Sequence, residues 1–164
     1  MKNNICILGI DPGFDRMGIA ILEKKQGVEK LIFSTCVITN KKESFGDRLF
    51  QIGTDLEKII LKHKPDHLSI EKLFITNNQM TVMHVSESRG VCIYVAKKHN
   101  LKIFEYSPPQ IKLAVTGYGK SNKEAVSLMV SRILKINSAV KIIDDEFDAI
   151  AVALTHSATV KNSL

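Results

Sequence analysis

The sequence of 164 residues has no tryptophan and only three cysteines, Cys6, Cys36 and Cys92. They are widely spaced among apolar neighbours, which is typical of small core residues in a reducing compartment. A disulfide framework and a cysteine-based zinc site are therefore not expected. No apolar run approaches membrane-spanning length, and residues 1–4 are too short a leader for a signal peptide. These absences predict a cytoplasmic protein with no membrane attachment.

The composition suits one folded domain, expected to span residues 1–164. The sequence is 45% hydrophobic, enough for a sizeable core but not for two domains of this total length. Lysine and arginine number 23 against 17 acidic residues, which gives a net charge of +6. This excess favours a polyanionic partner, although it is equally typical of charge that only maintains solubility.

Hydrophobic periodicity predicts an α/β fold. The expected strands are residues 5–10, 17–23, 28–39, 67–71 and 101–106. The expected helices are residues 44–64, a helix that begins within 76–79 and ends in the basic turn 97–100, residues 110–115, residues 121–136, and a last helix from Asp144 or Asp145. Ser44 with Asp47, and Ser121 with Glu124, have the spacing of capping boxes. Short turns make the first three strands antiparallel, and helical crossovers make the last two parallel, in a mixed five-stranded sheet flanked by helices.

Two acidic residues stand where apolar strands end. Asp11 follows residues 5–10 and precedes Pro12-Gly13, and Glu71 ends residues 67–71. If the two strands are parallel neighbours, both carboxylates emerge at the same edge of the sheet. Such groups are costly to bury unless a cation neutralises them. For Asp11 alone, a turn-capping role is an equally good interpretation.

The last helix supplies further acids, because Asp145 and Asp148 are three residues apart and share a face. Packing that helix on the sheet would bring them to Asp11 and Glu71. Oxygen ligands without histidine or cysteine favour Mg²⁺ or Mn²⁺. Taken singly, each acid is better explained by a favourable helix dipole or a surface ion pair, whereas the set together favours a metal site. Asp144 and Glu146 compete with Asp145 for the role.

Three other features suit a DNA partner. Lys112, Lys120 and Lys123 surround a glycine-containing loop before a helix, which suits phosphate binding or an ordinary solvated turn. Phe74 precedes polar residues and could stack on a base, although a lone phenylalanine is more often part of the core. The helix from Met80 carries more apolar surface than one core face needs, which is typical of a symmetric dimer interface.

Several segments resemble the motifs of RuvC-type crossover junction endodeoxyribonucleases. They are Ile-Leu-Gly-Ile-Asp-Pro-Gly at 7–13, Ile-Glu-Lys-Leu-Phe at 70–74, Ser-Arg-Gly-Val at 88–91 and the segment 145–156, with further matches at 106–112 and 117–123. The first motif alone is weak, because Asp-x-Gly also opens actin-like phosphate-binding folds. The set, in this order over nearly the whole chain, is specific.

The resemblance implies a ribonuclease-H-like fold and a homodimer that resolves Holliday junctions in recombination and repair by symmetric paired nicks in strands of like polarity. It places the four ligands of two Mg²⁺ ions, which Mn²⁺ can replace, at Asp11, Glu71, Asp145 and Asp148. Some members have histidine where Asp145 stands. It matches DNA contacts of the family to Phe74, Lys112 and Lys123. Lys120 of the basic loop and Arg89 of the Ser-Arg-Gly-Val match complete the predicted DNA-binding set. The resemblance also implies four-way junction DNA and a branch-migration complex of the RuvA and RuvB kind as partners.

One segment departs from the resemblance, because Phe14-Asp15-Arg16 follows Gly13 where the family commonly has a small residue. Other functions stay open at this point. A ribonuclease-H-like nuclease for another branched or hybrid nucleic acid would use the same acids, and a non-catalytic junction-binding protein would not need them. An actin-like nucleotide-binding protein usually has a second lobe, for which this chain is too short.

Overall fold

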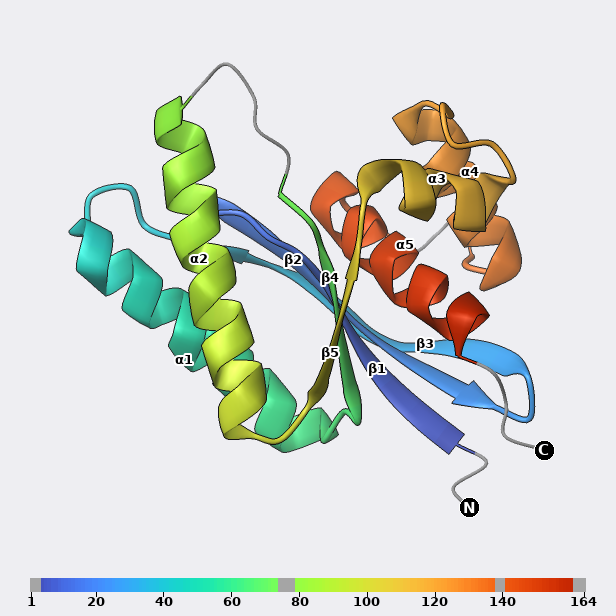
Figure 1. Cartoon of the computed structure of the whole chain (residues 1–164), viewed down its shortest axis with the longest axis horizontal. Coiled ribbons are helices and arrows are strands. Elements are labelled where there is room, and N and C mark those ends of the chain that lie inside the picture. The colour runs from blue at the N-terminus through green and yellow to red at the C-terminus, as the bar shows by residue number, and fades with distance from the viewer. Residues whose placement is uncertain (1–3, 74–78, 138–140, 161–164) are drawn as a thin grey trace.

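The computed structural model describes residues 4–73, 79–137 and 141–160. They form the elements β1 (Asn4–Asp11), β2 (Arg16–Lys25), β3 (Val28–Ile38), α1 (Phe45–His63), β4 (His67–Glu71), α2 (Gln79–Lys98), β5 (Lys102–Tyr106), α3 (Pro108–Thr116), α4 (Lys123–Ile133) and α5 (Asp144–Thr159). Figure 1 shows α1 and α2 on one face of the sheet and α3, α4 and α5 on the other. No helix in these ranges is long and apolar enough to cross a membrane.

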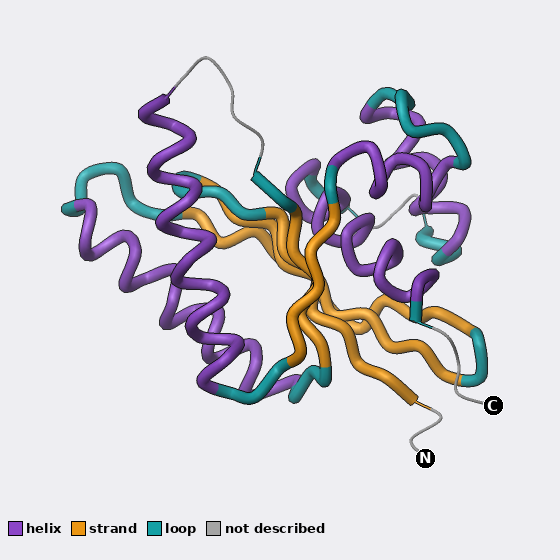
Figure 2. The backbone as a smooth tube through the Cα atoms, in the orientation of Figure 1, coloured by secondary structure: helices purple, strands orange, loops and turns teal. Residues whose placement is uncertain are grey.

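The predicted sheet is confirmed. The described strands have the order β3-β2-β1-β4-β5. The pairs β1–β2 and β2–β3 are antiparallel, and the pairs β1–β4 and β4–β5 are parallel. Figure 2 shows these strands as one twisted layer between the helices. The parallel pair β1–β4 is what brings the carboxyl ends of two central strands to the same edge.

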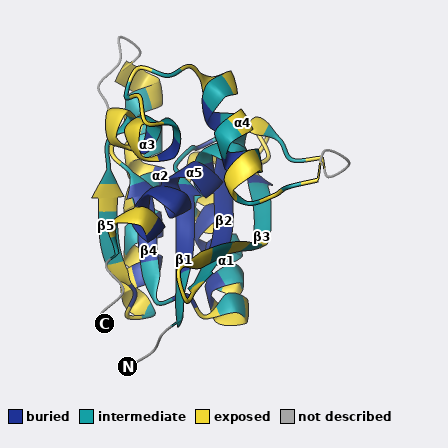
Figure 3. Cartoon of the chain, turned by 90° about the vertical axis from the view of Figure 1, so that its right-hand side faces the viewer, coloured by how far each residue is buried: buried dark blue, intermediate teal, exposed yellow. Residues whose placement is uncertain are grey.

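Alternation along β1 assigns its side chains to two separate cores. Leu8 and Ile10 pack with α1 and α2, whereas Ile7 packs with α5. Successive side chains of a strand point to opposite faces, so Asp11 faces α5 together with Ile7. Figure 3 shows that the central strands and α5 are the most buried parts of the molecule.

Helix α5 lies unusually close to the sheet because β1 and β2 present glycines to it. A Cβ atom on Gly9 would lie 2.3 Å from the Ala149 carbonyl oxygen, and one on Gly18 would lie 1.9 Å from the Asp145 carbonyl oxygen. Any larger residue at either position would push the N-terminal half of α5 away. The glycines therefore set the distance between the acids of α5 and those of the strands.

Buried polar contacts fix α5 along the sheet as well. Ser69 Oγ of β4 donates to the Val152 carbonyl at 2.8 Å. The His156 ring bonds His67 through Nε2 and Tyr106 through Nδ1, each at 2.8 Å. Burial lowers the pKa of His156 to about 4, so this histidine is neutral at physiological pH. These contacts tie α5 to both β4 and β5.

Three predicted helix ends differ from the structure. Helix α3 begins at Pro108 and not at residue 110, capped by Ser107 with a capping box to Gln110, because proline is well suited to the first turn. Asn122, and not Ser121, caps α4. Helix α4 also ends at Ile133, short of the predicted residue 136. The predicted Ser44 cap of α1 is confirmed.

Candidate active site

Asp11 is a carboxylate in surroundings that disfavour its charge. Burial, followed by the charges of Asp148, Glu71 and Asp145, raises the pKa of Asp11 to about 8, and Lys123 acts against this rise. A carboxyl group with this pKa holds a proton at neutral pH unless a cation replaces it. Asp11 is the last residue of β1 and lies on the same face of the strand as Ile7, which directs its side chain toward α5.

Glu71 joins Asp11 at the same sheet edge. The register pairs Ile10 with Ile70, so the two acids are the next residues on adjacent parallel strands. Burial, followed by the charge of Asp148, raises the pKa of Glu71 to about 7, and Lys112 lowers it. The prediction from the two strand ends is therefore confirmed in its geometry.

Helix α5 contributes Asp148 to the same cleft, which has a volume of about 300 Å³. Among the described residues, the polar lining consists of Asp11, Glu71, Lys112, Lys123 and Asp148. Lys123 Nζ lies 2.9 Å from Asp148 Oδ2. Pro108 and Ile111 of α3, Val126 of α4 and Ala151 of α5 form the apolar part of the wall.

Asp145 lies beside this cleft but is bound to Arg16. Arg16 donates to Asp145 Oδ2 from Nε at 3.0 Å and from Nη2 at 2.6 Å. The guanidinium holds the pKa of Asp145 below its usual value. Asp145 is not among the described residues that line the cleft. Its charge still contributes to the raised pKa of Asp11, so the two carboxylates are close enough to interact.

The acidic residues on either side of Asp145 in the sequence, Asp144 and Glu146, do not join the acids of the cleft. Glu146 accepts a hydrogen bond from Ser34 Oγ of β3 and is thereby directed away from the cleft. The Asp144 side chain is 79% exposed and lies 3.6 Å from Lys123 Nζ. In this arrangement neither residue replaces Asp145.

The donor set fits divalent cations. Asp11, Glu71 and Asp148 offer only oxygen atoms, the ligands preferred by Mg²⁺ and Mn²⁺. Burial and mutual repulsion raise the pKa values of Asp11 and Glu71, and a cation between them would relieve both effects. As the described side chains lie, no three acids, histidines or cysteines are close enough together to ligate one ion. A cation at Asp148 would compete with Lys123, whose Nζ lies 2.9 Å from Asp148 Oδ2.

The predicted DNA-binding residues divide into four groups. Lys112 and Lys123 line the cleft, whereas Lys120 is exposed and is not among its described lining residues. Arg89 points inward: Nε donates to the Glu71 carbonyl at 3.2 Å, and Nη2 lies 3.0 Å from Glu105 Oε2. Arg89 thus holds the end of β4, which carries Glu71, against β5. Phe74 lies outside the described residues.

Sequence reasoning missed the role of Arg16. The register pairs Asp11 with Gly18 of β2, and Arg16 is two residues from Gly18 on the same face of the sheet. The predicted antiparallel pairing of the first two strands would have placed this arginine beside the acids. The pairing with Asp145, 129 residues away, has no local signal.

The protein-family model described as "Crossover junction endodeoxyribonuclease RuvC" matches residues 7–156. The chain belongs to the RuvC family of crossover junction endodeoxyribonucleases. It is 40% identical over 150 residues to the RuvC of Petrotoga mobilis, covering 92% of this chain and 91% of that protein. It is 41% identical over 150 residues to the RuvC of Finegoldia magna, with the same coverage of each chain.

Solved structures agree with this assignment. RuvC of Thermus thermophilus, solved in complex with a Holliday junction substrate, has a TM-score of 0.86 and 27% identity over 93% of this chain and 92% of that chain. The yeast mitochondrial Holliday junction resolvase Ydc2 has a TM-score of 0.70 at 13% identity, which shows a shared fold. The fold expected from the resemblance, a mixed sheet between helices as in these nucleases, is confirmed.

Proposed function

We propose that this RuvC-family protein hydrolyses phosphodiester bonds in four-way junction DNA at the cleft formed by Asp11, Glu71 and Asp148. The observation that carries the proposal is the meeting of three carboxylates from β1, β4 and α5, two of them with raised pKa values, beside Lys112 and Lys123. The relatives are named crossover junction endodeoxyribonucleases, and the Thermus thermophilus protein was solved with a Holliday junction.

Asp11, Glu71 and Asp148 would hold two divalent ions, with Asp145 as a fourth ligand once it releases Arg16. When bound, such ions activate the attacking water and stabilise the leaving oxygen of the phosphodiester. Asp11 lies on the rigid central strand, and the α5 acids are positioned by Gly9, Gly18 and the polar contacts beneath the helix. Lys112 and Lys123 bind phosphate oxygens of the cleaved strand, and the N-terminus of α4 adds a favourable dipole there.

A homodimer would supply the two cleavage sites that a two-fold symmetric junction requires. On α2, Met80, Met83 and Tyr94 are 60%, 55% and 69% exposed. Such an apolar helix face suits pairing with a second copy. Symmetric nicks in recombination and repair, partners of the RuvA and RuvB kind and a cytoplasmic location follow from the resemblance and stay predictions.

The test of this function is nicking of a mobile four-way junction in Mg²⁺. We expect paired nicks in strands of like polarity, none in EDTA, and little cleavage of plain duplex or of an RNA–DNA hybrid of the same sequence. Equal cleavage of the hybrid would favour the alternative of a ribonuclease-H-like nuclease with another substrate. Junction binding without any nicking in Mg²⁺ or Mn²⁺ would favour a non-catalytic binding protein.

Lys123→Ala is expected to slow nicking by about 10- to 100-fold, because the ammonium is the positive group nearest Asp148 in the cleft. Loss of one phosphate contact should also reduce the slope of log binding constant against log salt by about 1. Rates and binding are measured on the same junction over a salt series. Lys58→Ala is the matched control, since Lys58 lies on α1 and pairs with Asp55. If the two variants had the same nicking rate and the same salt dependence of binding, Lys123 would be an ordinary solvated surface residue.

A further inference from the structure

The ion pair between Arg16 of β2 and Asp145 of α5 lies at the border between the carboxylate cleft and the β1–β2 turn. Both hydrogen bonds from the guanidinium go to one oxygen atom, Asp145 Oδ2. The Arg16 side chain is 48% exposed and the Asp145 side chain is 22% exposed. An ion pair this open to solvent adds little to the stability of a fold, because water screens its charges. The pair is therefore open to exchange with another ligand of either side chain.

The backbone of Asp145 is fixed next to Asp11. Gly18 of β2 is the register partner of Asp11, and a Cβ atom on Gly18 would lie 1.9 Å from the Asp145 carbonyl oxygen. The first turn of α5 thus lies directly on the strand residue beside Asp11. Asp145 is nevertheless absent from the described lining of the cleft while its side chain is bound to Arg16. A change of side-chain direction, without movement of α5, is the smallest step that brings this fourth carboxylate to the others.

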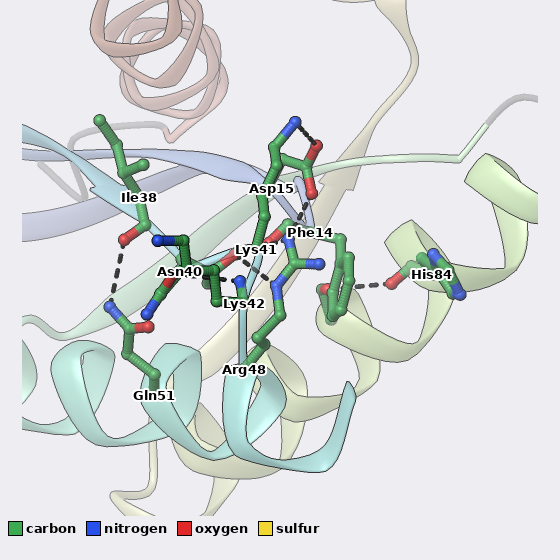
Figure 4. A network of polar contacts seen from close by, with 11 residues as sticks. Phe14, Asp15, Ile38, Asn40, Lys41, Lys42, Arg48, Gln51 and His84 are labelled. Atoms are coloured by element: carbon green, nitrogen blue, oxygen red, sulfur yellow. Dashed lines mark hydrogen bonds and ion pairs between the residues drawn. The ribbon is translucent and has the colours of Figure 1, made fainter. Parts of the chain in front are cut away.

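The backbone of Arg16 is fixed by the contacts of the residue before it (Figure 4). Asp15 Oδ2 lies 2.8 Å from Lys41 Nζ, and Asp15 also forms an ion pair with Arg48 of α1. The Thr39 amide donates to the Asp15 carbonyl at 3.1 Å. Because successive side chains of an extended segment point to opposite sides, Asp15 is directed to α1 and Arg16 to α5. An exchange of partners at Arg16 therefore involves its side chain and not the turn that carries it.

The Arg16 guanidinium opposes cation binding in the free protein. It holds the pKa of Asp145 below its usual value, so Asp145 keeps its negative charge, and Arg16 neutralises that charge. A divalent ion that binds Asp145 must displace the guanidinium and is repelled by the same positive charge until it does so. Arg16 should therefore weaken the binding of cations to a site that includes Asp145.

A phosphate is well suited to take Arg16 from Asp145. A guanidinium can bind two oxygen atoms of a phosphate at once through charge-assisted hydrogen bonds, whereas it binds a single oxygen of Asp145. A DNA strand held by Lys112 and Lys123 carries further phosphates along its backbone, and Arg16 is an exposed cation beside the same cleft. Strand binding thus offers Arg16 a better partner and frees Asp145.

We propose that Arg16 is a positioning residue that holds Asp145 out of the metal site in the free protein and releases it when a phosphate of the bound strand takes the guanidinium. The proposal rests on the proposed function, since it needs cations and a DNA strand at the cleft. Junction binding and cation binding then strengthen each other through Arg16. Arg16 belongs to Phe14-Asp15-Arg16, the segment in which this chain departs from the family pattern.

The first test is calorimetric titration of the DNA-free protein with Mn²⁺. Arg16→Ala should bind Mn²⁺ about 3- to 10-fold more tightly than the wild type, because Asp145 is free and one repelling charge is gone. Arg16→Gln removes the same charge but keeps a polar side chain, and it should behave alike. Lys41→Ala is the matched control, since it removes one positive charge near the same turn but leaves the contact with Asp145 in place. It should bind Mn²⁺ within about 2-fold of the wild type.

A double-mutant cycle shows whether Arg16 acts through Asp145. In an Asp145→Asn background, Arg16→Ala should change the Mn²⁺ affinity by no more than about 2-fold, because only its charge at a distance is left to act. A purely structural contact would lower the melting temperature of Arg16→Ala without strengthening Mn²⁺ binding. An effect of Arg16→Ala that is equally large in both backgrounds would show that the guanidinium acts as a remote charge, and would overturn the proposal.

The second test measures the coupling between cation and junction. Junction affinity is compared in Ca²⁺ and in EDTA at fixed ionic strength. The gain in affinity from Ca²⁺ should be about 3- to 10-fold larger for the wild type than for Arg16→Ala, since linkage requires the two effects to match.

Equal gains, or unchanged or weaker Mn²⁺ binding by Arg16→Ala, would overturn the role of Arg16 while leaving the proposed function intact. Failure of the wild type to nick any junction in Mg²⁺ would instead overturn the proposed function. If Arg16→Ala does not fold, Arg16→Gln decides by the same criteria.

Discussion

Asp11→Asn is expected to abolish nicking while leaving junction binding intact. Asparagine has nearly the same shape but lacks the charge needed to hold a divalent ion between β1, β4 and α5. We expect a loss of about 1,000-fold or more in rate, which corresponds to about 4 kcal/mol of transition-state stabilisation. Binding depends mainly on lysines and backbone phosphates and should change little at fixed salt. Single-turnover nicking in Mg²⁺ and a binding isotherm in Ca²⁺ measure the two effects separately.

The same substitution should stabilise the metal-free protein. The pKa of Asp11 is about 8 in the folded chain, against 3.8 as the ordinary value. A carboxyl group with a raised folded pKa binds more protons in the folded state, so stability that is present at low pH is lost as pH rises toward 8. Asparagine has no proton to lose. The melting temperature of Asp11→Asn should therefore exceed that of wild type at pH 8, and the difference should vanish near pH 4.

Asp55→Asn is the control for both effects, since Asp55 lies on α1 and pairs with Lys58 far from the cleft. It should nick and melt like the wild type. If Asp11→Asn lost junction binding to the same extent as nicking, this would count against Asp11 as a metal ligand. If Asp11→Asn melted at a lower temperature than the wild type at pH 8 in EDTA, this would contradict the burial of an uncompensated carboxylate at Asp11.

The strands were predictable because short apolar or β-branched runs are bounded by turn residues. β4 was predicted with its observed bounds, and the other strands to within two residues at either end. Helix starts were less predictable, because several residues nearby can cap. Ser121 and Asn122 are both good caps, but the Ser121 hydroxyl bonds Thr116 Oγ1 at 2.7 Å, which leaves the cap to Asn122. Which of the two residues caps α4 therefore depends on the fold of the loop and not on the capping preference of either residue type.

The site was predictable to the extent that it follows from topology. Asp11 and Glu71 meet because parallel neighbouring strands end together, and Asp148 joins them because α5 packs on that face. Side-chain partners across the fold were not predictable in the same way. Arg16 binds Asp145, and Arg89 forms an ion pair with Glu105. The spacing of these residues in the sequence does not indicate either contact.

Metal binding is expected to release protons, and its strength should rise steeply with pH. Asp11 and Glu71 have pKa values of about 8 and 7 in the metal-free protein, so both are mostly protonated at pH 6. A cation binds only the ionised carboxylates, so binding must displace these protons. We expect about two protons released per site at pH 6, about one at pH 7.5 and none well above pH 8. The apparent affinity should rise up to about 100-fold from pH 6 to 7 and then level off above pH 8.

Calorimetric titration with Mn²⁺ in two buffers of different ionisation heat gives the number of protons directly. Glu71→Gln removes one titrating group, so the Mn²⁺ that it still binds should release about one proton fewer at pH 6 than in the wild type. Asp11→Asn should show no Mn²⁺ binding at concentrations that saturate the wild type. Asp55→Asn should match the wild type. Nicking rates at limiting Mg²⁺ should follow the same pH dependence, because they depend on the occupied site. Metal binding without proton release at pH 6 would show that the carboxylates that bind the cation are already ionised, and would remove Asp11 and Glu71 from the ligand set.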